Sequence, residues 1–200
     1  TAGSWSVGTG LPAWVDGVNY RITSKATDKA ANAQPSAVVD FLVDRSTPVA
    51  VLQNFVAVNS TVAAVSGQVR SSLDSLSGTA WDIAGAGGSA GKLDKVLVHI
   101  KRPAQGGDGL RYWEWTTRTW DAVQAEESAV YWGTSTIHVP GVDISSWTHA
   151  VLPPPGAFTQ GYSYIVRARA RDTSLPQGNT QQIFTLNESS FTIVWDAQPP

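Results

Sequence analysis

The 200-residue sequence contains no cysteine and no methionine. Without cysteine there can be no disulfide bond, no thiolate metal site and no cysteine nucleophile. Without an initiating methionine, we expect the natural protein to begin upstream of Thr1 and this sequence to be a section of a longer chain.

Strong charge and long apolar runs are also missing. The net charge is only −2 and no stretch is dominated by one sign, whereas nucleic-acid-binding proteins usually carry a basic patch. No apolar stretch approaches the roughly 18 residues that a transmembrane helix needs. We therefore expect no nucleic-acid partner and no transmembrane segment.

The residues that are abundant favour β-structure. Hydrophobic residues make up 42% of the sequence, enough for a packed core, and there are 9 tryptophans. Threonine, serine, valine and glycine dominate much of the rest, and helical periodicity is weak. This composition is typical of an all-β, extracellular protein.

Two segments of the chain resemble each other. Residues 17–28 and 161–172 share a glycine, a tyrosine, an aliphatic residue, an alanine and an aspartate at the same spacing. In both, apolar and polar residues alternate with period two, which indicates a half-buried strand. In both, an asparagine follows, and then an apolar strand, predicted over residues 37–43 and about 190–195.

The similarity ends in the pattern Asp-x-x-x-Pro, which begins at Asp44 in the first copy and at Asp196 in the second. We therefore interpret residues 1–48 as the incomplete C-terminal portion of one repeat and residues 49–200 as one complete repeat. Residues 44–48 are the expected linker, stiffened by Pro48.

Turn signals divide the second repeat into short strands. The expected strands cover residues 49–56, 61–65, 76–83, 95–101, 110–116, 119–123, 129–132 and 136–139. Many short strands with Gly- and Pro-rich turns predict a β-sandwich. Because a simple immunoglobulin domain has only about 100 residues, we expect additional strands around residues 105–140.

These motifs resemble the immunoglobulin-like and fibronectin-III-like tandem repeats of large bacterial surface or secreted proteins. The resemblance lies in the repeated Tyr-to-Pro pattern, in Leu76-Ser-Gly-Thr-Ala-Trp-Asp82, and in Tyr112-Trp113 followed by Trp120. It implies an immunoglobulin-like β-sandwich that serves as a stalk, adhesin or fibre subunit at the cell surface. The alternatives are a carbohydrate-binding module and an accessory β-sandwich of an exported hydrolase.

Oxygen-bearing side chains near the expected linker suggest a metal site. Asp28, Asn32 and Asp44 could bind calcium, which takes six to eight oxygen ligands. The corresponding set in the second copy is Asp172, Asn179 and Asp196. The alternative is that Asp28 and Asp172 accept hydrogen bonds from loop amides. No other cofactor is expected.

Four tryptophans are candidates for glycan binding by stacking on sugar rings: Trp113, Trp115, Trp120 and Trp132. The alternative is that they pack in the core of the sandwich.

Nothing in the sequence calls for catalysis. The histidines have no metal-ligand spacing, and no serine-nucleophile motif is present. We expect that the protein is not an enzyme.

Residues 1–48 are too few to bury a core alone. Their expected partners are neighbouring repeats or copies of the same chain, which could complete the sheet by adding strands.

Overall fold

A computed structural model describes residues 4, 6–53, 67–122, 128–137, 139–175 and 177–198. Within these residues the regular elements are β-strands and two short 3-10 turns, η1 (Ala129–Tyr131) and η2 (Pro155–Ala157). The predicted all-β class is confirmed.

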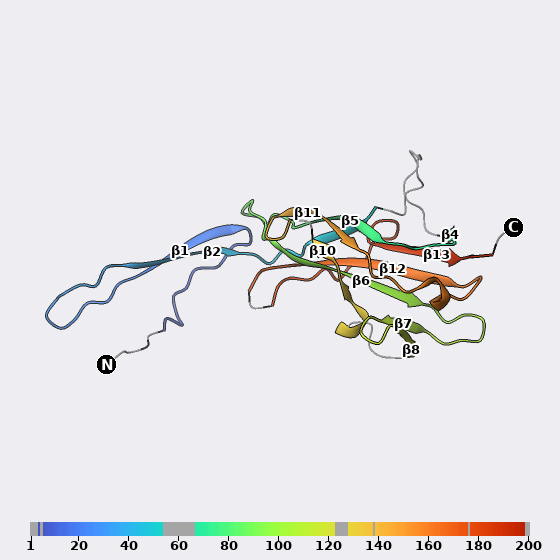
Figure 1. Cartoon of the computed structure of the whole chain (residues 1–200). Helices are drawn as coiled ribbons and strands as arrows, with labels where there is room; N and C mark the ends of the chain where they lie inside the picture. Colours follow the sequence, from blue (N-terminus) through green and yellow to red (C-terminus); the bar gives the residue numbers. More distant parts are fainter. Residues whose placement is uncertain are drawn as a thin grey trace.

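Two sheets form the main body of the molecule (Figure 1). The smaller sheet has the order β10 (Thr136–Ile137), β11 (Ile144–His149), β5 (Leu76–Trp81) and β3 (Val49–Leu52). The larger has the order β4 (Gln68–Arg70), β13 (Ser190–Trp195), β12 (Ser163–Asp172), β6 (Leu93–Arg102), β7 (Arg111–Glu114) and β8 (Thr119–Asp121), and β9 (Gly133–Thr134) pairs with β6. Neighbouring strands are antiparallel, except that β4 runs parallel to β13.

The core lies between these two sheets and follows the period-two pattern of the strands. Along β12, Tyr164, Val166, Ala168 and Ala170 are fully buried. They belong to one hydrophobic cluster with residues of β3, β5 and β6 and with Trp147 of β11. The apolar faces of two sheets packed together give the arrangement of a β-sandwich.

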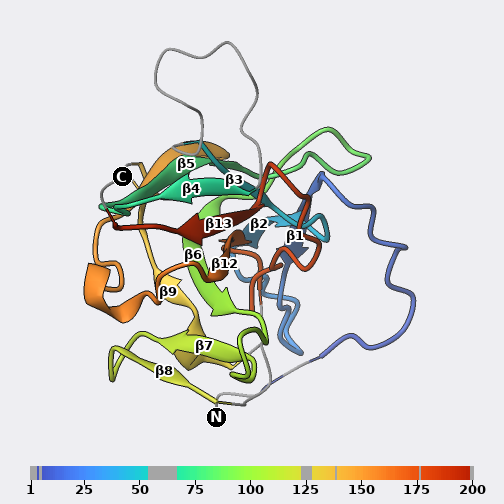
Figure 2. The ribbon, with the colours of Figure 1, turned by 90° about the vertical axis from the view of Figure 1, so that its right-hand side faces the viewer.

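The outer face of the larger sheet is covered as well. The β7–β8 hairpin lies at the edge of the molecule remote from β5, with β9 beside it (Figure 2). Its Tyr112 and the neighbouring Trp132 contact the ring of His99, which points away from the core and is nevertheless fully buried. The additional strands predicted around residues 105–140 therefore cover part of the outer face of the larger sheet and bury a second layer of side chains there.

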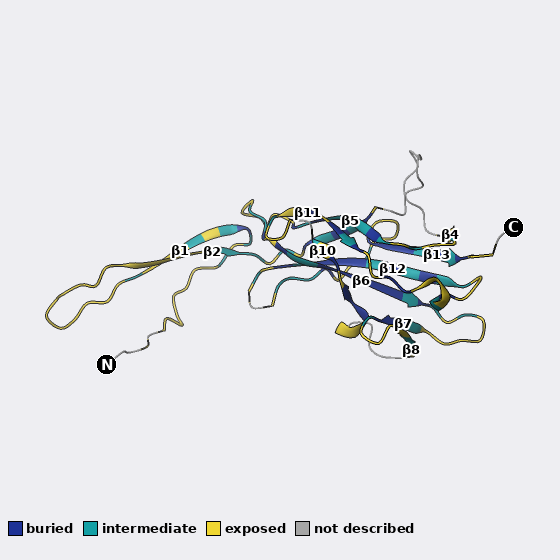
Figure 3. Cartoon of the chain, viewed as in Figure 1, coloured by how far each residue is buried: buried dark blue, intermediate teal, exposed yellow. Residues whose placement is uncertain are grey.

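A separate hairpin, β1 (Val18–Ser24) and β2 (Ala37–Val43), extends from one end of the sandwich (Figure 1). Among the described residues, these two strands pair only with each other. Apolar residues that a sheet normally buries are exposed here, including Ile22, Val38 and Val39 (Figure 3).

Backbone hydrogen bonds fasten the base of this hairpin to the sandwich. The amide of Gly87 donates to the carbonyl of Asp16, and the amide of Ser89 donates to the carbonyl of Gly17. The carboxylate of Asp16 accepts from the amide of Arg45, which stands in the connection between β2 and β3. The loop after β5 thus supports the point where the hairpin enters the sandwich.

Some local predictions were wrong. Residues 129–132 were expected to form a strand, but the 3-10 turn η1 occupies Ala129–Tyr131. Strand β11 was not predicted, although it stands in the middle of the smaller sheet. The strand expected over residues 61–65 lies outside the described residues.

Candidate functional site

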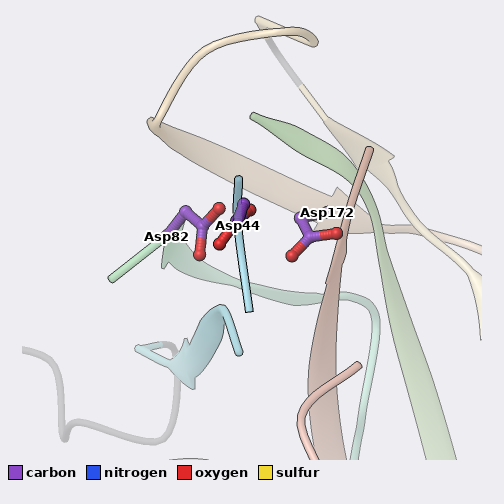
Figure 4. A group of neighbouring side chains, drawn as sticks. All are labelled: Asp44, Asp82 and Asp172. Atoms are coloured by element: carbon purple, nitrogen blue, oxygen red, sulfur yellow. The ribbon is translucent and has the colours of Figure 1, made fainter. Parts of the chain in front are cut away.

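Three aspartates from distant parts of the chain meet where the hairpin joins the sandwich (Figure 4). Asp44 follows β2, Asp82 follows β5, and Asp172 is the last residue of β12. One carboxylate oxygen from each lies within 4.8 Å of the corresponding oxygens of the other two.

The sheet registers explain why these three positions coincide. Val49, the first residue of β3, pairs with Trp81, the last residue of β5, so the connection from β2 arrives beside Asp82. Asp172 pairs with Leu93 at the beginning of β6. The ends of β5 and β12 and the beginnings of β3 and β6 therefore share one end of the sandwich.

Asp172 is held rigidly by its own loop. The residue is 1% exposed. Its Oδ1 accepts hydrogen bonds from the amides of Ser174 and Asn179, at 2.9 and 2.7 Å, and from the hydroxyl of Ser174. Its Oδ2 accepts from the side-chain amide of Asn179. Such bonds fix the direction of the carboxylate.

Asp82 and Asp44 are satisfied on one oxygen only. Oδ1 of Asp82 accepts from the amide of Ile83, and Oδ1 of Asp44 accepts from the amide of Ser46. The Oδ2 atoms of both residues are buried and have no partner within hydrogen-bonding geometry among the described residues. The backbone of Gly91 nevertheless lies close enough to Asp82, and the carboxyl group of Asp82 close enough to Asp44, to lower the pKa of each neighbour somewhat. Buried oxygens without partners are costly and rare in folded proteins.

Gly91 shows where these two free oxygens point. A Cβ atom built on Gly91 would lie 2.0 Å from Oδ2 of Asp44 and 2.5 Å from Oδ2 of Asp82. Both oxygens therefore approach the same stretch of backbone, and only glycine leaves room for them. A cavity of about 570 Å³ opens beside Gly91 and is also lined by Asp44 and Ser174.

The electrostatics follow from burial and from the proximity of like charges. Removal from water raises the pKa of Asp82 to about 6, and the charge of Asp44 contributes in the same direction. The pKa of Asp44 is also raised, first by burial and then by the charge of Asp172. A proton or a cation would relieve this repulsion, and carboxylate oxygens are ligands for hard cations such as Ca²⁺.

The calcium site predicted from Asp28, Asn32 and Asp44 is wrong. The register of the hairpin runs from Val18 opposite Val43 to Ser24 opposite Ala37, so Asp28 and Asn32 lie at the tip and Asp44 at the base. The carboxylate of Asp28 instead accepts bonds from the amides of Ala30 and Asn32 and from the side chain of Asn32.

The three corresponding residues of the second copy, Asp172, Asn179 and Asp196, do not all come together either. Asp172 and Asn179 lie together, but Asp196 lies at the opposite end of the sandwich, because Val194 pairs with Ser163 at the beginning of β12. Of the metal ligands predicted first, only Asp44 belongs to the aspartate cluster. The sequence signals for the other members were an aspartate directly after a strand at Asp82 and the Asp172–Asn179 pair.

The four tryptophans do not form an exposed strip. Trp113 and Trp132 are 2% and 5% exposed. Trp115 and Trp120 pack against the core, and their indole N–H groups donate to the backbone carbonyls of Tyr131 and Ala157. The structure therefore contradicts their assignment as a glycan-stacking surface and gives them the packing role.

In the part of the chain that the structure describes, no helix is long and apolar enough to cross a membrane. Compared with known proteins, the sequence matches no family model and has no significant similarity to a curated protein.

Proposed function

We propose that this chain is a non-catalytic structural module of a repetitive bacterial surface or extracellular protein, in which immunoglobulin-like sandwiches follow one another. In this proposal, the β1–β2 hairpin is the final strand pair of a sandwich that precedes residue 49. The supporting observation is that the hairpin repeats four contacts made by β12, β13 and the segments next to them.

The first repeated contact is a tyrosine corner. The hydroxyl of Tyr20 accepts a hydrogen bond from the amide of Val15 at 2.8 Å, and the hydroxyl of Tyr164 accepts one from the amide of Thr159 at 2.7 Å. In both copies the tyrosine lies five residues after the amide. A tyrosine that bonds back to the chain upstream is a hallmark of immunoglobulin-like sandwiches.

The turn before each strand is repeated too. Gly17 and Gly161 both have a φ of +76°, a left-handed conformation that suits glycine. The amide of Gly17 donates to the carbonyl of Val43, and the amide of Gly161 donates to that of Trp195.

The aromatic packing follows the same pattern. The rings of Trp14 and Tyr20 lie edge to face at 4.8 Å, and those of Phe158 and Tyr164 lie edge to face at 4.9 Å.

The loops after the two strands share an Asp–Asn pair, although the loop after Asp172 is longer than the loop after Asp28. Asn32 donates to the carboxylate of Asp28 through its backbone and side-chain amides, and Asn179 does the same to Asp172. Agreement at the turn, the corner, the ring pair and the loop supports a common origin for residues 14–46 and 158–198.

The two copies differ in what covers them. Tyr164 and Val166 are fully buried by β6 and the opposite sheet, whereas Ile22, the counterpart of Val166, is 44% exposed. A hairpin of this kind is marginal in water without a further layer. A preceding sandwich body would supply that layer, and a chain of such bodies is a spacer or adhesive stalk.

A fusion protein tests this proposal. Residues 49–157 are placed directly before Trp14, so that the β1–β2 hairpin receives a sandwich body of the same kind. We expect slow hydrogen exchange at the amides of β1 in the fusion and fast exchange in the original chain, because pairing and burial protect amides.

The control is a duplication in which residues 49–200 are followed by a second copy of residues 49–200. If both copies of the duplication fold while β1 in the fusion stays unprotected, residues 14–46 are not the end of a sandwich and the proposal fails. The carbohydrate-binding alternative is not supported, because the four tryptophans form no exposed strip. No described feature favours an accessory role in a hydrolase.

A further inference from the structure

We propose that Asp44, Asp82 and Asp172 bind one calcium ion, which fastens the segment after β2 to the end of the sandwich. This proposal is independent of the origin of the hairpin, because it rests on the aspartate cluster alone.

The negative charge of the cluster is uncompensated. Three carboxylates meet within 4.8 Å, and none of the ion pairs found among the described residues involves any of them. At this separation, carboxylates repel each other strongly in a site that water reaches poorly. A divalent cation offsets that repulsion.

A buried carboxylate oxygen of Asp82 points into the cluster. Asp82 is 6% exposed, and in the described part of the chain no donor reaches its Oδ2 with hydrogen-bonding geometry, although the backbone of Gly91 lies nearby. The position of Gly91 shows that this atom and Oδ2 of Asp44 converge. Ordinary folding satisfies such atoms with donors, whereas a metal site leaves them free for the ion.

The ligand chemistry selects the ion. The converging groups offer oxygen alone, and the hydroxyl of Ser174, beside Asp172, is a further oxygen. Zinc prefers nitrogen and sulfur ligands, and magnesium retains several waters in a strict octahedron. Calcium accepts several carboxylates in irregular geometry, which suits a site assembled from three separate segments.

The proposed ligands come from two different parts of the molecule. Asp82 and Asp172 belong to the sandwich, whereas Asp44 belongs to the connection from the hairpin. The side-chain amide of Asn179 also donates to the backbone carbonyl of Asp44, at 3.3 Å. Calcium would add to this neutral bond a strong link between the connection and the sandwich.

The test is calorimetric titration of the metal-free full chain with calcium chloride at pH 7.5. We expect one calcium ion per chain and a rise in Tm on binding. Asp82→Asn is expected to weaken the affinity by at least roughly tenfold, because calcium affinity depends on the charge of the ligands. Asp28→Asn makes the same charge change at the hairpin tip and is expected to leave the affinity unchanged.

Asp44→Asn provides a second variant, because this residue lies in the connection and its loss leaves the sandwich core intact. It is also expected to weaken binding by at least roughly tenfold. Terbium luminescence gives an independent readout, since Trp81 adjoins Asp82 and can sensitise a bound lanthanide.

The proposal is overturned if the folded wild-type chain binds no calcium at pH 7.5, because a shared proton would then be sufficient for the cluster. It is also overturned if Asp28→Asn abolishes binding while Asp82→Asn and Asp44→Asn, verified as folded, retain it.

Discussion

The hydroxyl oxygen of Tyr164 lies 2.7 Å from the amide nitrogen of Thr159. This bond ties the first strand of the last hairpin to the chain that leads into it, and the ring of Tyr164 is fully buried in the core. A single side chain thus fixes both the packing of β12 and the course of the chain before it.

Replacing Tyr164 by phenylalanine keeps the ring and removes the hydrogen bond. We expect a loss of about 1 kcal/mol in the free energy of unfolding of the sandwich, the usual net contribution of such a bond. Urea denaturation followed by tryptophan fluorescence measures it. The matched variant Tyr20→Phe removes the same bond from the exposed hairpin, and an equal loss there would contradict this assignment.

The stability of the protein should depend on the protonation of His99. Burial, followed by the charges of Lys101, Arg167 and Arg169, lowers the pKa of His99 to about 3. The unfolded chain therefore binds a proton below about pH 6.5 that the folded chain does not bind until about pH 3. The stabilising effect of this neutral histidine is complete above pH 6.5 and is lost as the pH falls towards 3.

Lowering the pH from 7 to 5 should reduce the free energy of unfolding by roughly 2 kcal/mol through this single group. His99→Phe keeps an aromatic ring between Tyr112 and Trp132 and removes the titration. We expect the variant to lose correspondingly less stability over this range in denaturation experiments at the two pH values. An identical pH dependence in both proteins would show that His99 is not responsible.

Gly78 should not tolerate a side chain. A Cβ atom at this position would lie 1.8 Å from the carbonyl oxygen of Val51 in the paired strand β3. Gly78→Ala is therefore expected to lower Tm and to cost roughly 2–3 kcal/mol, as overpacking typically does. Gly109→Ala, where nothing lies within 4 Å of the new atom, is the control and should leave Tm nearly unchanged.

The tryptophans should contribute to stability. Trp113 is 2% exposed and contacts Trp120 edge to face. Trp113→Ala is expected to cost about 3–5 kcal/mol in unfolding free energy, the usual range for a buried large aromatic residue. Trp14→Ala in the exposed hairpin should affect the sandwich transition much less. A small effect at Trp113 would reopen its assignment as a binding residue.

The sequence predicted those strands in which apolar and polar residues alternate clearly. The alternation at residues 17–28 and 161–172 matched β1 and β12, and the pattern at residues 95–101 lies within β6. Strand β11 was missed because its core-facing positions include Ser145, which gives no hydrophobic signal although it is 7% exposed. The burial of His99 had no signal in the sequence, because the cover formed by the β7–β8 hairpin and Trp132 depends on tertiary packing.

The aspartate cluster was predicted only through Asp44. Its three members are separated by long stretches of sequence and meet because β3, β5, β6 and β12 end or begin at one end of the sandwich. Linear spacing could not show that coincidence. It instead favoured Asp28 and Asn32, which are close to Asp44 along the chain and remote from it along the hairpin.

The two points where the chain enters and leaves the sandwich lie at opposite ends of it. Val49 begins β3 beside the aspartate cluster, whereas Trp195 ends β13 beside the first residues of β12, at the far end. A pulling force applied through the chain therefore acts along the strands, and it loads the hydrogen bonds of the β3–β5 and β12–β13 pairs in shear. Bonds loaded in shear must break together, whereas a force across the strands would unzip them one at a time.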